Sequence, residues 1–310
     1  MRIAILAGGV GGAKFADGMM RALPDPAALT VVVNVGDDFE HFGLKICPDL
    51  DTVCYTLAGL ENPTTGWGRR EETWHVMDAV AALGGPTWFR LGDKDLATHL
   101  ERTRRLRAGE PLSQIVASFC RAWGVPARVL PVTDDPVPTI VLTDEGALPF
   151  QTYFVHRRWQ PKVLGFRFEG ASRARPAPGV LEALQGADAV FFAPSNPFVS
   201  IDPILAIPGV RASLRGKPVI AVSPIVGGKA LKGPAAKMFR ELGYTPSAQA
   251  VAEHYQGLIT HFVLDKADAS QAKGLRSKVP HVWVMDTIMA SPEARQRFAQ
   301  KLLGRLLQAS

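Results

Sequence analysis

The segment ILAGGVGGAK (residues 5–14) joins a predicted first strand to a predicted first helix. It combines an apolar run, closely spaced glycines and a lysine at the start of the helix. Glycines allow backbone N–H groups to approach phosphate oxygens, and the positive end of the following helix adds electrostatic attraction. The segment therefore predicts a phosphate or nucleotide site, and a simple tight turn is the alternative. The binding residues would be Gly9, Val10, Gly11, Gly12 and Lys14.

This segment matches neither of the two standard nucleotide-binding patterns. The dinucleotide fingerprint needs a third glycine at the position of Lys14, and the Walker pattern needs a longer spacing before its Gly-Lys pair. The segment alone therefore leaves the nucleotide unidentified.

Short apolar runs alternate with helical patterns on both sides of this segment. A helix is expected from about Lys14 to Leu23, and further strands are expected at LTVVVNV, ARVLPV, ADAVFFAP, KPVIAVSPI and HFVLD. Continuous apolar strands separated by helices predict an α/β fold with a Rossmann-like parallel sheet flanked by helices. Ligands of such sheets lie at the carboxyl ends of the strands.

The middle of the chain departs from this alternation. Residues 138–170 predict a small antiparallel hairpin region around Asp-Glu-Gly, and residues 69–123 predict a helical cap. No internal repeat, low-complexity tract or linker is visible. We therefore expect one domain over residues 1–310 with two insertions.

Composition limits the class of protein. The chain has 310 residues, of which 47% are hydrophobic and 21% charged, as in compact proteins. Its net charge of +6 suits anionic substrates, and the basic run Arg102 to Arg107 is interpreted as a solvated helix face, so nucleic acid is not favoured. No apolar stretch could span a membrane. Cys47, Cys54 and Cys120 show no paired spacing, which favours structural thiols and a cytoplasmic location.

Four aspartates fall in two loops near the predicted phosphate site. Asp37 and Asp38 follow a glycine after the second strand, and Asp49 and Asp51 precede a helix that either could cap. Carboxylates gathered beside a phosphate site are suitable ligands for magnesium. The alternatives are helix capping and an exposed acidic turn.

A polar stripe follows in the segment Arg90 to Gln114. It is interpreted as the end of a strand and then a helix with Asp93 as its N-cap. Asp95, His99 and Arg102 recur on one helical face, which is either a solvent face or a pocket wall. His99 is a candidate general base, with a structural role as the alternative.

Two loops in the C-terminal half repeat the pattern of polar residues after an apolar strand. Ser195 and Asn196 follow one strand, and Ser223 and Gly227 follow the next, with Lys229 and Lys232 within reach of phosphate. The loop at residues 131–139 adds another acid pair. Together these loops predict an extended ligand that carries phosphate.

The ordered set of motifs resembles the 2-phospho-L-lactate transferase family, also called the CofD or FbiA family, of coenzyme F420 biosynthesis. The matching motifs run from Gly8 to Ala235 and are GGVGGAK, VVNVGDD, ICPDLDT, GWGRREETWH, LGDKDLATH, TDDPV, APSNPFVSIDPIL and SPIVGGKALKGPA. The motif GWGRREETWH resembles the actinobacterial, FbiA-like branch most closely.

This resemblance implies a Mg²⁺-dependent transfer. A phospholactyl-type group would pass from a guanosine diphosphate conjugate to the terminal ribityl hydroxyl of the deazaflavin Fo, with release of GMP. The resemblance places Asp51 and Arg90 at Fo, and Asp37, Asp38 and Asp51 at the metal; Asp51 is our candidate catalytic base. It also implies a homodimer.

Two other functions remain open at this point. A nicotinamide-dependent oxidoreductase would use a similar glycine loop, although Asn34 stands where an acid is needed and the third glycine is missing. A regulator that binds nucleotide sugars, resembling the YvcK proteins, would share the loop and the sheet. Within the transferase interpretation, the three-carbon group could be phospholactate, phosphoenolpyruvate or phosphoglycerate.

Overall fold

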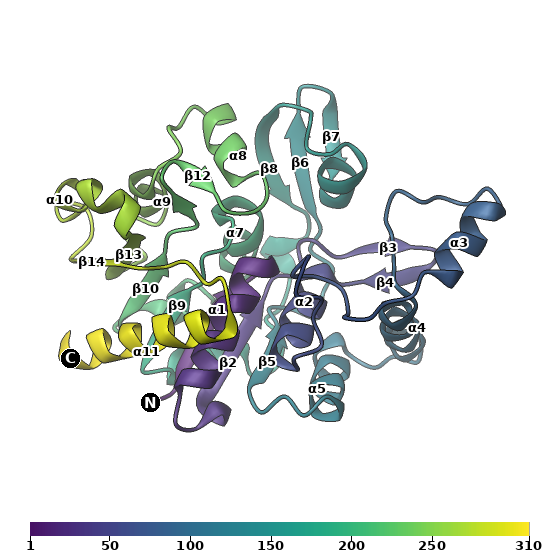
Figure 1. Ribbon diagram of the computed structural model, residues 1–310, viewed down its shortest axis with the longest axis horizontal. Helices are drawn as coiled ribbons and strands as arrows, with labels where there is room; N and C mark the ends of the chain where they lie inside the picture. Colours follow the sequence, from purple (N-terminus) through teal and green to yellow (C-terminus); the bar gives the residue numbers. More distant parts are fainter. Residues whose placement is uncertain (310) are drawn as a thin grey trace.

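A seven-stranded parallel sheet forms the centre of the molecule (Figure 1), as predicted. The computed structural model describes residues 1–309. The strands lie in the order β14 (His281–Met285), β13 (His261–Asp265), β10 (Val219–Val222), β9 (Ala189–Phe192), β1 (Ile3–Ala7), β2 (Leu29–Val33) and β5 (Arg128–Pro131). Strand β14 was not predicted; the other strands of this sheet were.

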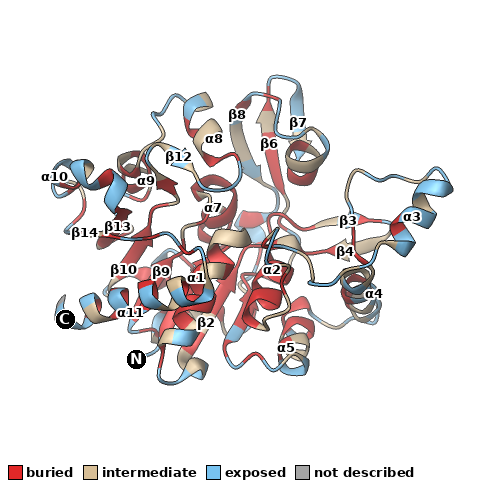
Figure 2. Ribbon diagram, in the orientation of Figure 1, coloured by how far each residue is buried: buried red, intermediate tan, exposed pale blue. Residues whose placement is uncertain are grey.

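The central strands are buried because apolar side chains fill both faces, which helices cover. Every residue of β1 and β9 is buried, as is every residue of β2 except Thr30, and Figure 2 shows the central strands mostly in red. In Figure 1, α1 packs beside α2 and α11 in front of the sheet. None of the described helices is long and apolar enough to cross a bilayer. The helices are α1 (Gly9–Ala22), α2 (Pro48–Leu57), α3 (His75–Ala82), α4 (Asp93–Arg107), α5 (Leu112–Ala122), α6 (Val180–Gly186), α7 (Asp202–Leu205), α8 (Ala235–Glu241), α9 (Ala248–His254), α10 (Ala272–Leu275) and α11 (Pro292–Ala309).

Helix α1 begins earlier than predicted. It starts at Gly9, inside the glycine segment, so that Gly8 is the single residue between β1 and α1. Gly9 has φ of +60°, a backbone conformation that glycine adopts without strain. The glycines expected to form a loop are therefore the first turn of the helix.

The antiparallel region contains β6 (Thr139–Thr143), β7 (Gly146–Pro149) and β8 (Val163–Phe168), and its hairpin turns at Asp144 and Glu145 as predicted. The second strand was predicted too long: it ends at Pro149, and a π-helix occupies Thr152–His156. The helical path lets the rings of Phe150 and Phe154 stack at 5.4 Å. Tertiary packing has overridden the strand pattern here.

The predicted helical cap is only partly correct. Helix α5 packs against β5 in the body of the molecule, whereas α3 belongs to an arm that projects from it (Figure 1). An unpredicted hairpin, β3 (Phe39–His41) and β4 (Leu44–Ile46), forms the rest of the arm. A second apolar cluster holds the arm together and consists of Ile46, Met77 and Leu91 with Phe39, Leu44, Phe89 and Leu96 packed against it.

The N-termini of α3 and α4 cap each other. Asp93, predicted as an N-cap, is the first residue of α4 and accepts hydrogen bonds from the backbone N–H groups of His75 and Val76 in α3. In return, the carboxylate of Glu72 accepts from the N–H groups of Lys94 and Asp95 in α4. Each acid satisfies N–H groups that lack a partner within their own helix.

Replacing Glu72 with Ala should lower the free energy of unfolding by about 1 kcal/mol, as loss of a helix cap generally does. Hydrogen exchange should become faster in the first turn of α4. The adjacent Glu71 is 84% exposed at its side chain and lies 3.9 Å from Lys94, so Glu71→Ala is the matched control and should change little. Equal effects of the two variants would contradict the capping role.

Candidate functional site

A cavity of about 690 Å³ opens at the carboxyl ends of the parallel strands. Its walls come from the segments after β1, β2, β9, β10 and β14, together with α2, α4 and the π-helix at Thr152–His156. This is the edge of the sheet where the strand pattern predicted a ligand. The predicted site residues that line it are Gly9, Val10, Gly11, Lys14, Asp37, Asp49, Asp51, Arg90, Ser195, Asn196 and Ser223.

Three predicted residues do not line this cavity, and each has another role in the structure. A Cβ at Gly12 would lie 2.8 Å from Ser195 Oγ, so Gly12 serves close packing. Asp38 turns away and pairs with Lys45 at 3.1 Å. The backbone N–H of Gly227 donates to Asp268 at 2.9 Å and is therefore already engaged.

The glycines of the first helical turn have a packing function as well. A Cβ at Gly11 would overlap the carbonyl oxygen of Pro194, in the segment that follows β9. The hydroxyl of Ser195 donates to the Gly8 carbonyl at 2.7 Å, which ties that segment to the start of α1. The glycine pattern therefore brings the segments after β1 and β9 together at the cavity.

Lys14 adds a cation one turn further along α1, on the cavity wall. Burial, followed by the nearby charges of Arg295 and Lys232, lowers its pKa. An anionic ligand in the cavity would therefore gain a charge partner that is partly removed from water.

Asn34 holds two carboxylates of the cavity wall together, and one of them, Asp49, lies beside the glycine turn. Its side-chain Nδ2 donates to Asp37 Oδ1 at 3.0 Å and to Asp49 Oδ2 at 2.9 Å. Burial and then the Asp49 charge raise the pKa of Asp37 well above its usual value, and burial raises the pKa of Asp49 to about 7. Two buried carboxylates that have no cationic partner within residues 1–309 fit a divalent cation, since its charge would replace the proton that the pair otherwise retains.

Asp51 has a cationic partner of its own. Both terminal nitrogens of Arg102 donate to its two carboxylate oxygens, and Arg102 is 1% exposed. Burial raises the pKa of Asp51, and the charges of Arg102 and then His99 oppose that rise. The four predicted metal ligands are thus divided: Asp37 and Asp49 form one pair, whereas Asp38 and Asp51 are each neutralised by a basic residue.

The polar stripe on α4 is a pocket wall. Asp95 and His99 line the cavity, and one ligand atom each from Asp51, Asp95 and His99 lie within 4.8 Å of one another, close enough to hold a metal ion. The hydroxyl of Tyr55 donates to Asp95 Oδ1 at 2.8 Å.

The hydrogen-bond network assigns the tautomer of His99. Its Nδ1 lies 3.2 Å from a guanidinium nitrogen of Arg102, which can only donate. His99 Nδ1 is therefore the acceptor, and the ring proton is on Nε2, which lies 3.4 Å from Asp95 Oδ1. In this state His99 has no free lone pair for a substrate proton, so it orients Arg102 and Asp95.

Arg90 lies where the cavity meets the arm. Its guanidinium is 4.1 Å from the centre of the Trp74 ring, an arrangement that keeps the charge at the cavity edge. No strand precedes it, contrary to our prediction. The cavity also has aromatic walls, which come from Phe89, Tyr55, Trp67 and the π-helix residue Phe154.

Several residues that line the cavity or support its walls were missed by sequence reasoning. Asn34 was noted only as an unsuitable ribose ligand, although its place at a strand end pointed to the site. The segment Thr287–Ala290 was missed because β14 was missed. Gln151 and Phe154 were assigned to a strand, and nothing local identifies them as cavity residues.

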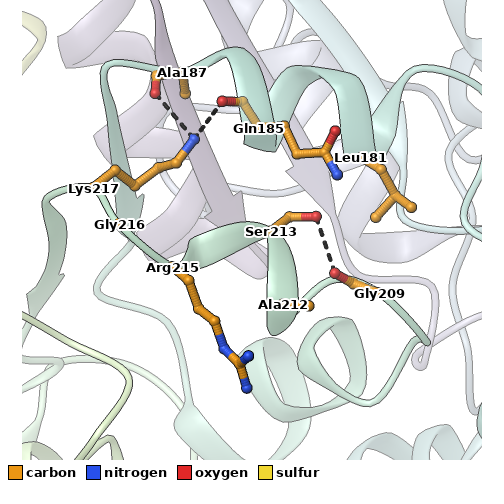
Figure 3. A pocket seen from close by; sticks show the side chains of 9 residues that line it. All are labelled: Leu181, Gln185, Ala187, Gly209, Ala212, Ser213, Arg215, Gly216 and Lys217. Carbon is orange, nitrogen blue, oxygen red and sulfur yellow. Dashed lines mark hydrogen bonds between the residues drawn. The ribbon is translucent and has the colours of Figure 1, made fainter.

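A second cavity of about 540 Å³ lies at the opposite, amino ends of β9 and β10 (Figure 3). The ammonium of Lys217 donates to the carbonyls of Leu184, Gln185 and Ala187, and the Ser213 hydroxyl donates to Gly209. These polar groups are already bonded to backbone carbonyls of the protein and are not free for a ligand, so this cavity is a less suitable ligand site than the first.

The sheet and the first cavity define an α/β protein in which a glycine turn, a lysine and buried carboxylates meet in one cavity at the strand ends. The sequence model described as 2-phospho-L-lactate transferase CofD matches residues 3–302. The chain therefore belongs to the CofD family, a family of transferases.

Curated relatives named phosphoenolpyruvate transferase match nearly the whole chain. The Streptomyces griseus protein is 45% identical, with coverage of 96% of this chain and 97% of its own. The Thermobifida fusca protein is 48% identical (87% and 88%), and the Mycolicibacterium smegmatis protein is 43% identical (95% of both chains).

The fold also resembles a solved structure from Bacillus halodurans. Its TM-score is 0.57 at 15% identity, with coverage of 96% of this chain and 90% of that one. A second structure from this organism, described as a UPF0052 family member, gives 0.54 at 14% identity, with 97% and 89% covered. At such low identity the similarity concerns the fold alone.

Proposed function

We propose that this protein transfers a phosphoenolpyruvyl group from a guanosine diphosphate conjugate to the terminal ribityl hydroxyl of the deazaflavin Fo, as a step of coenzyme F420 biosynthesis. The observation that carries the proposal is the shared cavity of the glycine turn, the Asp37–Asp49 pair and the Asp51–Arg90 region. Membership of the CofD family supports the transferase class. The printed names of the relatives favour phosphoenolpyruvate among the three acids considered.

The donor occupies the part of the cavity around α1. Backbone N–H groups of the first helical turn and the Lys14 ammonium neutralise its diphosphate. Ser195 and Ser223 lie on the adjoining walls, where their hydroxyls donate to the carbonyls of Gly8 and Ile225 and so hold in place the segments that enclose the same ligand. This arrangement holds the reacting phosphorus fixed, and phosphoryl transfer depends mainly on such positioning and charge neutralisation.

The Asp37–Asp49 pair would hold Mg²⁺. When bound, the ion supplies positive charge to the diphosphate and so lowers the energy of the charged transition state. The raised pKa values of both carboxyls support this assignment, because each acid lacks a cationic partner among the described residues.

The acceptor enters beside α2 and α4, where Arg90 and the aromatic walls lie. Its terminal hydroxyl attacks the phosphorus of the three-carbon acid. A new oxygen–phosphorus bond forms, the bond to the GMP oxygen breaks, and the hydroxyl proton passes to a cavity carboxylate. A low-dielectric wall around this point strengthens each charge interaction.

Mass spectrometry of the products tests this function. Incubation with Fo, Mg²⁺ and guanylylated phosphoenolpyruvate should yield GMP and a phosphoenolpyruvyl-Fo diester in equal amounts. Asp49→Asn should abolish the product, and Glu101→Gln, an exposed acid paired with Arg104, should retain it. Turnover of the phospholactate or phosphoglycerate conjugate instead would correct the acid, and no turnover with any donor would favour the nucleotide-sugar regulator.

A further inference from the structure

We infer that Asp95, through its Oδ2 atom, is the carboxylate that binds the attacking hydroxyl of the acceptor and takes its proton. This inference rests on the proposed function and identifies a catalytic residue for it. Asp95 lies in the third position of α4 and lines the cavity.

The two oxygens of Asp95 have different surroundings. Oδ1 accepts from the Tyr55 hydroxyl at 2.8 Å and faces His99 Nε2 at 3.4 Å. Oδ2 takes part in no hydrogen bond or ion pair within residues 1–309, and it is not among the fully buried atoms. One oxygen therefore orients the carboxylate, and the other remains available to a ligand.

Asp51 is a less suitable acceptor for that proton. Arg102 engages both of its oxygens, so neither is free before a substrate binds. Asn34 donates to both Asp37 and Asp49, and this pair is assigned to the metal ion in the proposed function. Asp95 is therefore the better candidate to accept the hydroxyl proton, because its Oδ2 atom is available to a ligand.

The same network keeps Asp95 in its ionised form. Burial alone would raise the pKa of Asp95, but the His99 contact and the Tyr55 hydrogen bond lower it overall. A carboxylate held in this way orients the hydroxyl and accepts its proton as the phosphorus bond forms. His99 and Tyr55 are positioning residues for this group.

Asp95 and Asp51 lie close together on the cavity wall. Ligand atoms of Asp51, Asp95 and His99 lie within 4.8 Å of one another. An acceptor bound at the Asp95 carboxylate would therefore lie close to the Asp51–Arg102 ion pair. That pair supplies a fixed, neutral wall to the acceptor site.

Binding of two acceptors separates this role from a structural one. The probes are Fo and its analogue without the terminal ribityl hydroxyl, titrated by fluorescence in the presence of GDP and Mg²⁺. The wild-type protein should bind Fo roughly tenfold more tightly than the analogue, because the hydroxyl forms a hydrogen bond to a charged group. In Asp95→Asn the two affinities should agree within about twofold, whereas Glu101→Gln, on the same helix, should keep the wild-type difference.

Turnover and metal binding complete the test. Asp95→Asn should lower kcat by at least about 100-fold, with unchanged affinity for GDP and for Mn²⁺. Two results would overturn the inference while the transferase function stands. Asp95→Asn could still bind Fo more tightly than the analogue without the hydroxyl, or Asp95→Asn could lose its affinity for Mn²⁺. A wild-type protein that binds GDP but not Fo would overturn the proposed function together with this inference.

Discussion

Replacing Arg102 with Met is expected to lower the free energy of unfolding by about 3–5 kcal/mol, one of the two largest effects we predict. Arg102 is 1% exposed, and its guanidinium is bonded to Asp51 and to the Lys45 carbonyl. Its loss leaves the Asp51 carboxylate buried without a countercharge. For a chain of this length the melting temperature should fall by about 10 °C.

Two further variants distinguish the loss of charge pairing from the loss of packing. The double variant Arg102→Met with Asp51→Asn removes both charges and should recover a large part of the stability. Arg104→Met changes an exposed arginine on the same helix, paired only with Glu101, and should cost less than about 0.5 kcal/mol. If Arg102→Met and Arg104→Met melt alike, the buried ion pair does not support the site.

This pairing also changes how Asp51→Asn must be interpreted. The substitution leaves the Arg102 guanidinium buried beside a neutral amide, so lost activity could follow from lost structure. Asp95→Asn avoids this difficulty because Asp95 has no buried cation bound to it. Asp95→Asn is therefore the better substitution for kinetic measurements than Asp51→Asn, although Asp51 lies in the more prominent motif.

The sheet was predictable because its strands are continuous apolar runs with helical patterns between them. The rule that ligands bind at the carboxyl ends of strands then placed Ser195 and Ser223 at one cavity without any structural information. Strand β14 was missed because its sequence, HVWVM, begins with a histidine and lacks the nearly continuous burial of the other strands in this sheet: only two of its five residues are buried. The β3–β4 hairpin was missed because its strands are only three residues long, and its turn uses Phe42, whose φ is +53°.

Contacts between distant residues could not be predicted. Arg102 lies 51 residues from Asp51, and no local pattern indicates that α4 reaches α2. Cys54 and Cys120 were predicted to be structural thiols and are free and buried, but no spacing in the sequence indicates that the fold brings their sulfurs to 3.6 Å. Asp37 and Asp38 are adjacent in sequence, but the turn directs one to the cavity and the other to Lys45.

Magnesium should stabilise the protein more strongly at higher pH, the second of the two large effects. Without a divalent cation, Asp49 has a pKa of about 7 against a usual value of 3.8. The folded state then binds more protons than the unfolded state, so stability is lost as pH rises from about 4 through 7. Each unit by which the pKa of Asp49 differs between the folded and unfolded states corresponds to about 1.4 kcal/mol of stability, so this loss reaches several kcal/mol.

The measurement is the melting temperature with EDTA and with Mg²⁺ between pH 5 and pH 8. His261 complicates the EDTA curve alone, because burial lowers its pKa to about 4 and its contribution to stability rises with pH below 6.5. The difference between the two curves removes this contribution, since Mg²⁺ acts on Asp37 and Asp49. The difference should grow with pH in the wild type and disappear in Asp49→Asn, whose amide cannot ionise. A difference that stays constant with pH would exclude the Asp37–Asp49 pair as the cation site and direct attention to Asp51, Asp95 and His99.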